Sequence, residues 1–309
     1  MKWLSKLERL FPSRLQRDVP LAKKTSLGVG GPAQVFLQAV SLDDIVKITD
    51  FATEEDVPFS VIGGGTNILV HDRGIEGIVL STLGLTEYDW KSPRHGDNSR
   101  IIAESGVPLA RIVDLSGQLG WTGLEFATGI PGTIGGALAG NAGTEGKGLC
   151  DQLEWVETVE IGRGRRTWLK KELFSSYRQS CLGAPEKIVV RCGLLFRQTT
   201  ANQVKASIEA FRQKRKMQPG TAKTAGCVFK NPDTGISAGK LLDLAGCKEL
   251  RSGGAQVSRV HANFLEVEQD AKARDIYTLI TECRRRVYEM SGVWLELEIR
   301  LFGGPWGKW

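Results

Sequence analysis

The stretch VIGGGTNILV, residues 61–70, decides how the first half of this chain folds. Apolar residues lead into a triple glycine at 63–65 and out of it again at 68–70. Short apolar runs on both sides of a glycine turn predict a strand, a tight turn and a second strand. Glycine lets backbone N–H groups converge on an anion at close range, and the hydroxyl of Thr66 and the amide of Asn67 lie beside them. The turn is therefore a candidate phosphate site.

Two further glycine-rich stretches could serve the same purpose. GIPGTIGGALAGNAG at 129–143 contains no charged residue, whereas GVGGPA at 28–33 approximates the G-x-G-x-x-A pattern of dinucleotide-binding turns. The second of these is the weaker candidate, because Pro32 lacks an N–H and a basic Lys23-Lys24 pair precedes it instead of a buried strand. Any one such loop is usually a plain turn. Two loops, 63–67 and 129–143, in one strand-rich half favour a dinucleotide pocket.

The remaining hydrophobic patterns predict an α+β chain. Helices are expected over 42–55, 108–119, 202–211 and 270–290, and the last has one apolar stripe that ends at Gly292. The apolar stripe of the helix at 270–290 consists of Ile276, Leu279, Ile280, Cys283, Val287 and Met290. Strands are expected over 34–40, 58–62, 68–70, 77–82, 153–161, 187–196 and 293–302. In the last of these, apolar and polar residues alternate strictly. A joint is expected near 197–203, which gives a lead-in over 1–24 and domains over 25–200 and 201–309.

Composition excludes several classes of protein. The net charge is +6, but no run of Lys and Arg with interleaved aromatic residues indicates a nucleic-acid partner. The six cysteines form no CxxC pair, so neither a zinc ribbon nor a thioredoxin-type site is expected, and no metal is predicted. Charged residues interrupt the apolar residues of 1–11, and no apolar run of about 18 residues occurs, so we expect neither a signal peptide nor a membrane span. A cytoplasmic enzyme with reduced thiols fits these features.

Taken together, eight blocks of this sequence resemble the enolpyruvoylglucosamine reductases, a family of bacterial flavoenzymes of cell-wall synthesis. The blocks follow the family's order between about residues 20 and 303, which is far more specific than any single loop. They are TSLGVGG at 25–31, VIGGGTNILV at 61–70, GLEFATGIPGTIGGALAGNAG at 123–143, YR at 177–178, AGCVFKNP at 225–232, GGAQV at 253–257, HANF at 261–264 and LELE at 295–298.

The resemblance implies a vanillyl-alcohol-oxidase-type FAD-binding domain of two subdomains over 25–200, followed by a smaller α+β substrate-binding domain over 201–309. The short segment between Phe196 and Arg212 resembles the shorter of the family's two types, which lacks an inserted substrate loop. The cofactor-binding residues implied are Gly63, Gly64, Gly65, Thr66, Asn67, Gly129, Pro131, Gly132, Thr133, Gly135, Gly136, Asn141, Ala142 and Gly143. The substrate-binding residues implied are Tyr177, Arg212, Lys230, Asn231, Lys240 and His261.

The implied reaction is the reduction of the enolpyruvyl double bond of a UDP-sugar, with FAD as cofactor and NADPH as reductant. Three residues would be catalytic. Arg178 would fork onto the substrate carboxylate, whose charge grows in the transition state. Cys227 would donate a proton, and Glu298 would polarise the substrate.

Cys227 departs from the family pattern, since many relatives have serine at this position. A thiol, with an ordinary pKa of about 8.5, is a much stronger acid than an alcohol, so the substitution should preserve proton donation. A second departure is Gly140 and Thr144 around the Asn141-Ala142-Gly143 segment, which affects contacts near the flavin. His71 and His95 are expected in loops without a role.

Two other functions remain open at the level of sequence. One is a flavin oxidase acting on a small alcohol or hydroxy acid, although neither glycine loop has the histidine of a covalent flavin link. The other is a nucleotide-sugar-binding protein without catalysis, which would not need the proton donor Cys227. As small-molecule partners we expect NADPH and the UDP-sugar, with a monomer or weak oligomer and neither nucleic acid nor membrane.

Overall fold

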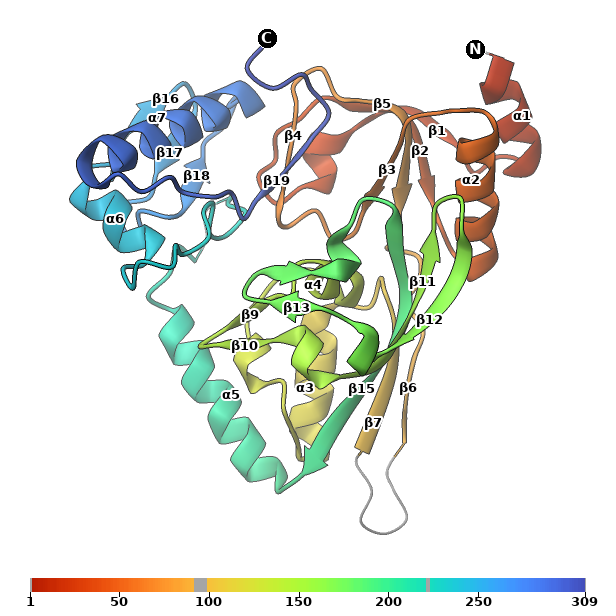
Figure 1. Cartoon of the computed structure of the whole chain (residues 1–309), viewed down its shortest axis with the longest axis horizontal. Helices are drawn as coiled ribbons and strands as arrows, with labels where there is room; N and C mark the ends of the chain where they lie inside the picture. Colours follow the sequence, from red (N-terminus) through yellow and green to blue (C-terminus); the bar gives the residue numbers. More distant parts are fainter. Residues whose placement is uncertain (1, 92–98, 221–222, 309) are drawn as a thin grey trace. The chain divides into compact units, whose positions relative to one another are not determined.

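A computed structural model describes residues 2–91, 99–220 and 223–308, so His95 lies outside the described residues. The chain divides into two compact units that interleave along the sequence (Figure 1). Unit 1 comprises residues 1–16, 35–64 and 77–215, and unit 2 comprises 17–34, 65–76 and 216–309. These compact units are defined by packing. The predicted ligand-binding domains, 25–200 and 201–309, are divided by function and remain a prediction.

The larger sheet of unit 1 has the strand order β12-β11-β15-β7-β6, and every neighbouring pair is antiparallel. Its strands are β6 (Tyr88–Lys91), β7 (Ser99–Glu104), β11 (Leu153–Glu160), β12 (Gly164–Leu169) and β15 (Lys187–Gln198). Helices α3 (Leu109–Leu119) and α5 (Ala201–Arg215) pack against each other. The core here includes Trp121, Phe126 and Phe196, which are almost fully buried.

A second, four-stranded sheet has the order β1-β2-β5-β3, in which β3 runs parallel to β5. Its strands are β1 (Gln16–Pro20), β2 (Pro32–Gln38), β3 (Phe59–Ile62) and β5 (Ile75–Ser81). Helices α1 (Lys2–Leu10) and α2 (Leu42–Glu54) supply buried residues to the same core, among them Leu7, Ile45 and Ile48. Ser41 caps α2 by accepting a hydrogen bond from the N–H of Asp44, as expected for a serine directly before a helix.

Short strands and 3-10 helices, together with helix α4, lie between the longer elements along the chain. Those of unit 1 are β8 (Trp121–Thr122), η2 (Glu125–Ala127), α4 (Ile134–Ala139), β9 (Gly143–Thr144), β10 (Lys147–Gly148), η3 (Leu149–Gln152), η4 (Lys170–Glu172), β13 (Ser175–Ser176), β14 (Gln179–Ser180) and η5 (Cys181–Gly183), while η1 (Leu21–Lys24) lies in unit 2.

Unit 2 combines a three-stranded sheet with two helices and a parallel strand pair. The sheet has the order β16-β17-β18 (Arg251–Ser252, Ala255–Val257 and Leu265–Val267), and the helices are α6 (Ala238–Leu244) and α7 (Ala273–Ser291). Strand β4 (Ile68–Val70) pairs in parallel with β19 (Arg300–Phe302), which joins the segment after the triple glycine to the end of the chain.

The C-terminal segment differs from its prediction as one strand over 293–302. Only Arg300–Phe302 is a strand, and Leu297 forms an isolated antiparallel bridge to Phe229. The predicted alternation is nevertheless present, because Leu295 and Ile299 are buried while Trp294 and Glu296 are exposed. Alternation requires only an extended backbone, and a ladder also requires a partner strand of the same length.

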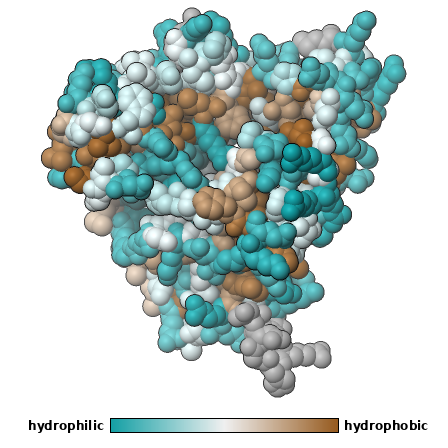
Figure 2. Space-filling view, viewed as in Figure 1, coloured by the Kyte–Doolittle hydropathy of each residue, from teal (hydrophilic) through white to brown (hydrophobic). Residues whose placement is uncertain are grey.

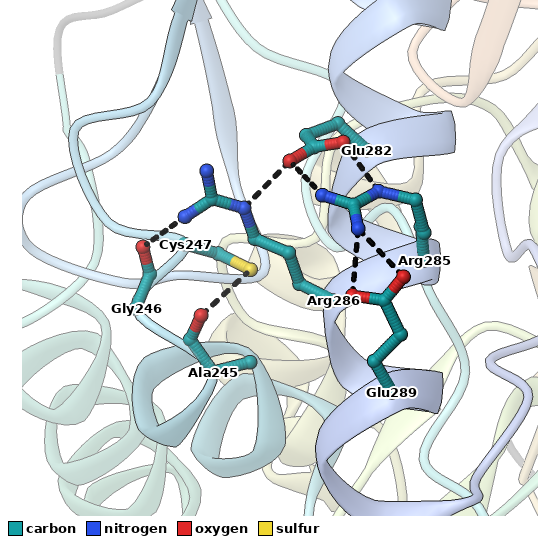
Figure 3. A network of polar contacts seen from close by, with 7 residues as sticks. All are labelled: Ala245, Gly246, Cys247, Glu282, Arg285, Arg286 and Glu289. Carbon is teal, nitrogen blue, oxygen red and sulfur yellow. Dashed lines mark hydrogen bonds and ion pairs between the residues drawn. The ribbon is translucent and has the colours of Figure 1, made fainter.

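Helix α7 confirms the strongest helical prediction and ends at Gly292, which adopts the left-handed conformation expected of a C-terminal glycine. Met290, predicted in its buried stripe, is instead 45% exposed because it lies in the last turn, beyond the core. On the outer face, Glu282 accepts hydrogen bonds from Arg285 and Arg286, and Arg286 also donates to the carbonyl of Gly246 at 3.2 Å (Figure 3). This network ties α7 to the loop that follows α6.

The face drawn in Figure 2 is largely hydrophilic, with smaller hydrophobic areas between the polar side chains. Across the parts of the chain that the structure describes, no helix is both long and apolar enough to cross a membrane. All six cysteines are free thiols.

Candidate functional site

The two glycine-rich segments predicted to hold a dinucleotide meet within unit 1. A Cβ atom on Gly63 would lie 2.9 Å from Oγ1 of Thr133, and one on Gly64 would lie 3.2 Å from Cα of Gly132. A side chain at either position would force its neighbour to shift, so glycine suits the 63–64 side of the contact. Gly132 itself has a φ of 114°, a conformation that L side chains rarely adopt. Sequence reasoning placed both loops in one site, and the backbone brings them into contact.

The N-terminal end of α4 does not offer free donors to an anion. Among the described residues, the N–H groups of Ile134 and Gly135 donate to the carbonyls of Val107 and Ser105, both at 2.9 Å. The N–H of Gly136 faces Oγ1 of Thr133 at 3.4 Å. Gly135 is glycine because a Cβ there would lie 2.6 Å from Cβ of Ser105. The first N–H groups of α4 therefore already have acceptors within the protein.

Gly136 provides the clearest sign that a group can rest on this segment. It is exposed, and a Cβ built on it would meet only Oγ1 of Thr133, at an ordinary 3.6 Å. Packing within the protein therefore does not require glycine at this position. A surface without side chains, beside the exposed Pro131 and the left-handed Gly129, fits the flat rings and diphosphate of FAD.

The end of the second glycine segment serves the protein itself. The side-chain amide of Asn141 donates to the carbonyl of Ser176 at 2.8 Å and accepts from the N–H of Cys150 at 3.1 Å. Ala142 donates its N–H to Ala137 and accepts from Leu149, and Gly143 pairs with Gly148 in a small hairpin. The cofactor-binding role expected for Asn141 remains a prediction, and both ends of its amide also bond to the backbone.

Tyr177 and Arg178 form the turn of the two-residue hairpin between β13 and β14. Arg178 has a φ of 53°, an uncommon left-handed conformation for a residue other than glycine. Tyr177 is 52% exposed, and the Arg178 guanidinium lies 6.0 Å from the centre of its ring. The predicted arginine is thus presented at the tip of a turn in unit 1.

Gly65, Thr66 and Asn67 belong to unit 2, where they lie against residues 24–26. A Cβ on Gly65 would lie 1.9 Å from the carbonyl oxygen of Lys24, and the N–H of Ser26 donates to the Gly65 carbonyl at 3.0 Å. The amide of Asn67, predicted to be available for a ligand, instead donates to the backbone carbonyl of Glu298 at 3.1 Å. This contact joins the glycine turn to a predicted catalytic residue.

Cys227 and Glu298 lie on adjacent extended segments of unit 2. The N–H of Glu298 donates to the carbonyl of Val228, the residue after Cys227, at 2.8 Å. Cys227 itself forms an antiparallel bridge with Phe264 on its other side. Both side chains are partly accessible, so a substrate can approach them. The structure therefore places the backbone segments of two predicted catalytic residues side by side, and the third residue, Arg178, lies in unit 1.

Four of the predicted substrate-binding residues gather around α6 in unit 2. Lys230 lies 3.3 Å from the carboxylate of Glu296, and Asn231 accepts a hydrogen bond from the N–H of Ala238 at 2.9 Å. Lys240 is exposed on the first turn of α6. The ring of His261 packs on Gly239, where a Cβ would lie 2.8 Å from it.

Burial lowers the pKa of His261, so its imidazole is neutral near pH 7. Its Nδ1 accepts a hydrogen bond from the N–H of Asn263 at 3.2 Å, which places the ring proton on Nε2. His261 can therefore donate a hydrogen bond to a ligand but adds no positive charge.

The remaining predicted substrate residue, Arg212, is separate from this group. It lies on α5 in unit 1 and pairs with Glu209 one turn earlier on the same exposed helix face, at 2.8 Å. Pairs of this type contribute little to stability and can be rearranged at small cost.

Sequence reasoning assigned no individual role to Asn263. It is 3% exposed, accepts a hydrogen bond from the N–H of Phe229 at 2.9 Å, and donates to the carbonyl of the same residue at 2.8 Å. These bonds hold the backbone two residues after Cys227. The signal was present in the HANF block, where an asparagine follows a histidine in an otherwise apolar stretch.

His71, expected to be a loop residue without a role, is fully buried. Its Nδ1 accepts a hydrogen bond from the N–H of Arg73, and its ring packs edge-on against Trp306 at 5.1 Å. The residue follows the short apolar strand β4, and the end of the chain covers it. Its role is structural.

The chain matches two family models that together cover most of its length. One, described as the C-terminal domain of UDP-N-acetylenolpyruvoylglucosamine reductase, matches residues 218–302, and one described as an FAD binding domain matches residues 33–170. The α+β class and FAD-binding domain expected from the sequence are thereby confirmed.

Similar proteins carry the same description. The UDP-N-acetylenolpyruvoylglucosamine reductase of Desulfosudis oleivorans is 38% identical and covers 98% of both chains, and that of Geobacter metallireducens is 37% identical and covers 97% of both. The crystal structure of the enzyme of this name from Thermus caldophilus has a TM-score of 0.80 and 34% identity, covering 94% of this chain and 99% of the other.

Proposed function

Since this chain belongs to the UDP-N-acetylenolpyruvoylglucosamine reductase family, we propose that Arg178, Cys227 and Glu298 are the catalytic residues for reduction of the enolpyruvyl substrate. The enzyme is a FAD-dependent oxidoreductase that uses NADPH to reduce UDP-N-acetylglucosamine enolpyruvate to UDP-N-acetylmuramate, a step of peptidoglycan precursor synthesis. The flavin oxidase and the binding protein without catalysis are not favoured. The observation that carries the residue assignment is the backbone hydrogen bond that places Glu298 beside the Cys227 segment.

We assign the flavin to the two glycine segments of the first domain. The contact of Gly63 and Gly64 with Gly132 and Thr133, and the open surface of Gly136, support this assignment. When bound, FAD would supply the hydride-transfer chemistry that links NADPH to the terminal vinyl carbon of the substrate. The donors of the 63–67 turn would hold the diphosphate, because the described N–H groups at the start of α4 already have protein acceptors.

Each catalytic residue then answers one chemical requirement. The guanidinium of Arg178 stays protonated and can fork onto both oxygens of the enolpyruvyl carboxylate as its charge increases. The thiol of Cys227 donates the proton to the carbon next to that carboxylate. Glu298, whose N–H donates to the carbonyl of Val228 directly after Cys227, polarises the substrate.

The nucleotide part of the substrate requires other residues. We assign four residues that gather around α6 to the diphosphate and the sugar: Lys230, Asn231, Lys240 and His261. Tyr177 and Arg212 are also assigned to substrate binding. The predicted monomer or weak oligomer, the cytoplasmic location and the lack of a nucleic-acid or membrane partner fit an enzyme whose ligands are NADPH and a UDP-sugar.

Product analysis tests the proposed function. The purified holoenzyme, incubated with NADPH and the enolpyruvyl UDP-sugar, should yield a product heavier by two hydrogen atoms, with one NADPH consumed for each product formed. Consumption of oxygen without change in the mass of the UDP-sugar would instead identify an oxidase.

A further inference from the structure

The hairpin that presents Arg178 cannot fix its own position. It contains only two residue pairs, Ser175 with Ser180 and Ser176 with Gln179. An isolated hairpin is marginally stable in water even when it is longer. Arg178 also holds a left-handed φ of 53°, a backbone conformation that is unfavourable for a residue with a side chain. The surrounding structure must therefore supply the order.

Asn141 fixes the position of the first strand of the hairpin through a hydrogen bond. Its Nδ2 donates to the carbonyl of Ser176, the residue directly before the Tyr177-Arg178 turn, at 2.8 Å. Its Oδ1 accepts from the N–H of Cys150 at 3.1 Å, and the residue is 8% exposed. A buried amide whose donor and acceptor are both used is held in one orientation.

Cys150 makes a second hydrogen bond, to the other strand of the hairpin. Its Sγ lies 3.7 Å from Oγ of Ser180 and 3.7 Å from the carbonyl of Leu138 on α4. Burial raises the pKa of the Cys150 thiol to about 11, so it remains a protonated donor at neutral pH. Both strands of the hairpin are thus attached to the segment around α4.

The local backbone is shaped to accommodate Asn141. Its φ is 42°, in the left-handed region that asparagine tolerates better than other residues with a side chain. A Cβ on Gly148 would lie 2.2 Å from Oδ1 of Asn141, so the amide occupies the space that glycine leaves there. The same residue type satisfies both the backbone and the two hydrogen bonds.

We infer that Asn141 is a positioning residue, which holds the Tyr177-Arg178 hairpin against the α4 segment so that Arg178 meets the substrate carboxylate. This inference rests on the proposed function of Arg178. Because Arg178 acts on the substrate, loss of the tie should slow reoxidation of the reduced flavin by substrate and leave reduction by NADPH intact. A misplacement of about 1 Å can cost on the order of 100-fold in rate.

Asn141→Asp is the sharpest test. Aspartate tolerates the same backbone conformation and still accepts from Cys150, but it presents an acceptor to the Ser176 carbonyl. We expect FAD content and the rate of anaerobic bleaching by NADPH to stay within about twofold of wild type. Reoxidation by the enolpyruvyl UDP-sugar should fall about 10- to 100-fold. The matched control is Asn202→Asp, an exposed asparagine on α5, which should change neither rate.

A double mutant shows whether Asn141 acts through Arg178. In an Arg178→Ala background, Asn141→Asp should add less than about twofold to the loss, because residues that act as a unit are not additive. Fully multiplicative losses would overturn the inference. So would unchanged reoxidation in the single variant, or loss of FAD binding and NADPH bleaching to the same degree as reoxidation.

Two further comparisons remove ambiguity. If Asn141→Asp does not fold, Asn141→Gly replaces it in the test. Glycine keeps the backbone conformation and deletes both side-chain hydrogen bonds. The rate of reoxidation by substrate is again compared with the rate of bleaching by NADPH. If the wild-type enzyme is not reoxidised by the UDP-sugar, the proposed function fails. If the wild type is reoxidised and both Asn141 variants match it, only the positioning role fails.

Discussion

The side-chain amide of Asn67 donates a hydrogen bond to the backbone carbonyl of Glu298 at 3.1 Å, although 231 positions separate the two residues. Directly beside it, the N–H of Arg300 donates to the carbonyl of Asn67 at 3.1 Å, and β19 continues the pairing along β4. One glycine turn therefore contributes to two tasks. Its first residues face the other glycine segment, and its last residue fixes the backbone that carries Glu298.

Asn67→Asp should weaken that attachment. The substitution keeps the size of the side chain but places an acceptor opposite the Glu298 carbonyl, which should cost about 1 kcal/mol because the contact is only partly buried. Urea unfolding should show a loss of that size, and reoxidation of the reduced flavin by substrate should slow by about tenfold. Wild-type stability together with wild-type reoxidation would show that the contact has no role.

Substitutions of Cys227 test proton donation. Cys227→Ala should still be bleached by NADPH, because no proton from this thiol enters that step, while reoxidation by the enolpyruvyl substrate should fall by about 100- to 10,000-fold. Cys227→Ser should retain substantial activity, since a hydroxyl can donate to the same carbon. Stopped-flow absorbance of the flavin measures both steps. Unchanged turnover in the alanine variant would remove Cys227 from the mechanism.

Gly65→Ala should destabilise the enzyme and weaken FAD binding. Gly65 has a φ of 66°, and a Cβ there would lie 1.9 Å from the carbonyl oxygen of Lys24. Gly162→Ala is the matched control, because Gly162 has a similar φ of 71° but open space around it. The backbone cost of about 1 kcal/mol is common to both variants. The Gly65 variant should lose at least about 2 kcal/mol more in urea unfolding, and equal losses would contradict the described packing.

The Glu282 network predicts a pH dependence of stability. Hydrogen bonds from Arg285 and Arg286 lower the pKa of Glu282 from 4.5 to about 2. A carboxyl with a lowered folded-state pKa stabilises the protein above pH 4.5, and that contribution is lost as the pH falls toward 2. Glu282→Gln should therefore cost about 0.5–1 kcal/mol at pH 7, a small value because the network is at the surface.

Urea midpoints at pH 7 and at pH 3 measure this effect. The difference between Glu282→Gln and the wild type should be smaller at pH 3. An equal difference at both pH values would show that the ion pairs do not contribute.

Local patterns in the sequence were sufficient for much of the fold. The helices expected over 42–55, 108–119 and 270–290 are α2, α3 and α7, because an apolar stripe of helical period needs only one surface to pack against. The strands expected over 153–161 and 187–196 are the central pair of the larger sheet. The two glycine segments were expected to form one dinucleotide pocket, and they are in contact with each other.

Contacts between residues that are distant in the sequence could not be predicted from local patterns. Nothing in residues 17–34 or 65–76 indicates that they pack with 216–309, since that arrangement depends on pairings such as β4 with β19. The protein partners of Asn67 and Asn141 could not be predicted either, because their amides bond to carbonyls that are distant in the sequence, those of Glu298 and Ser176. The cofactor-binding roles of both residues remain predictions.

The most direct test of the central claim is the absorption spectrum of the flavin without oxygen. The purified protein should be yellow, NADPH should bleach it, and one equivalent of UDP-N-acetylglucosamine enolpyruvate should restore the colour. The Arg178→Lys variant should bleach normally and recover at least about tenfold more slowly, because an ammonium cannot fork onto the carboxylate. Recovery only on admission of oxygen, or equal recovery in wild type and variant, would contradict the account.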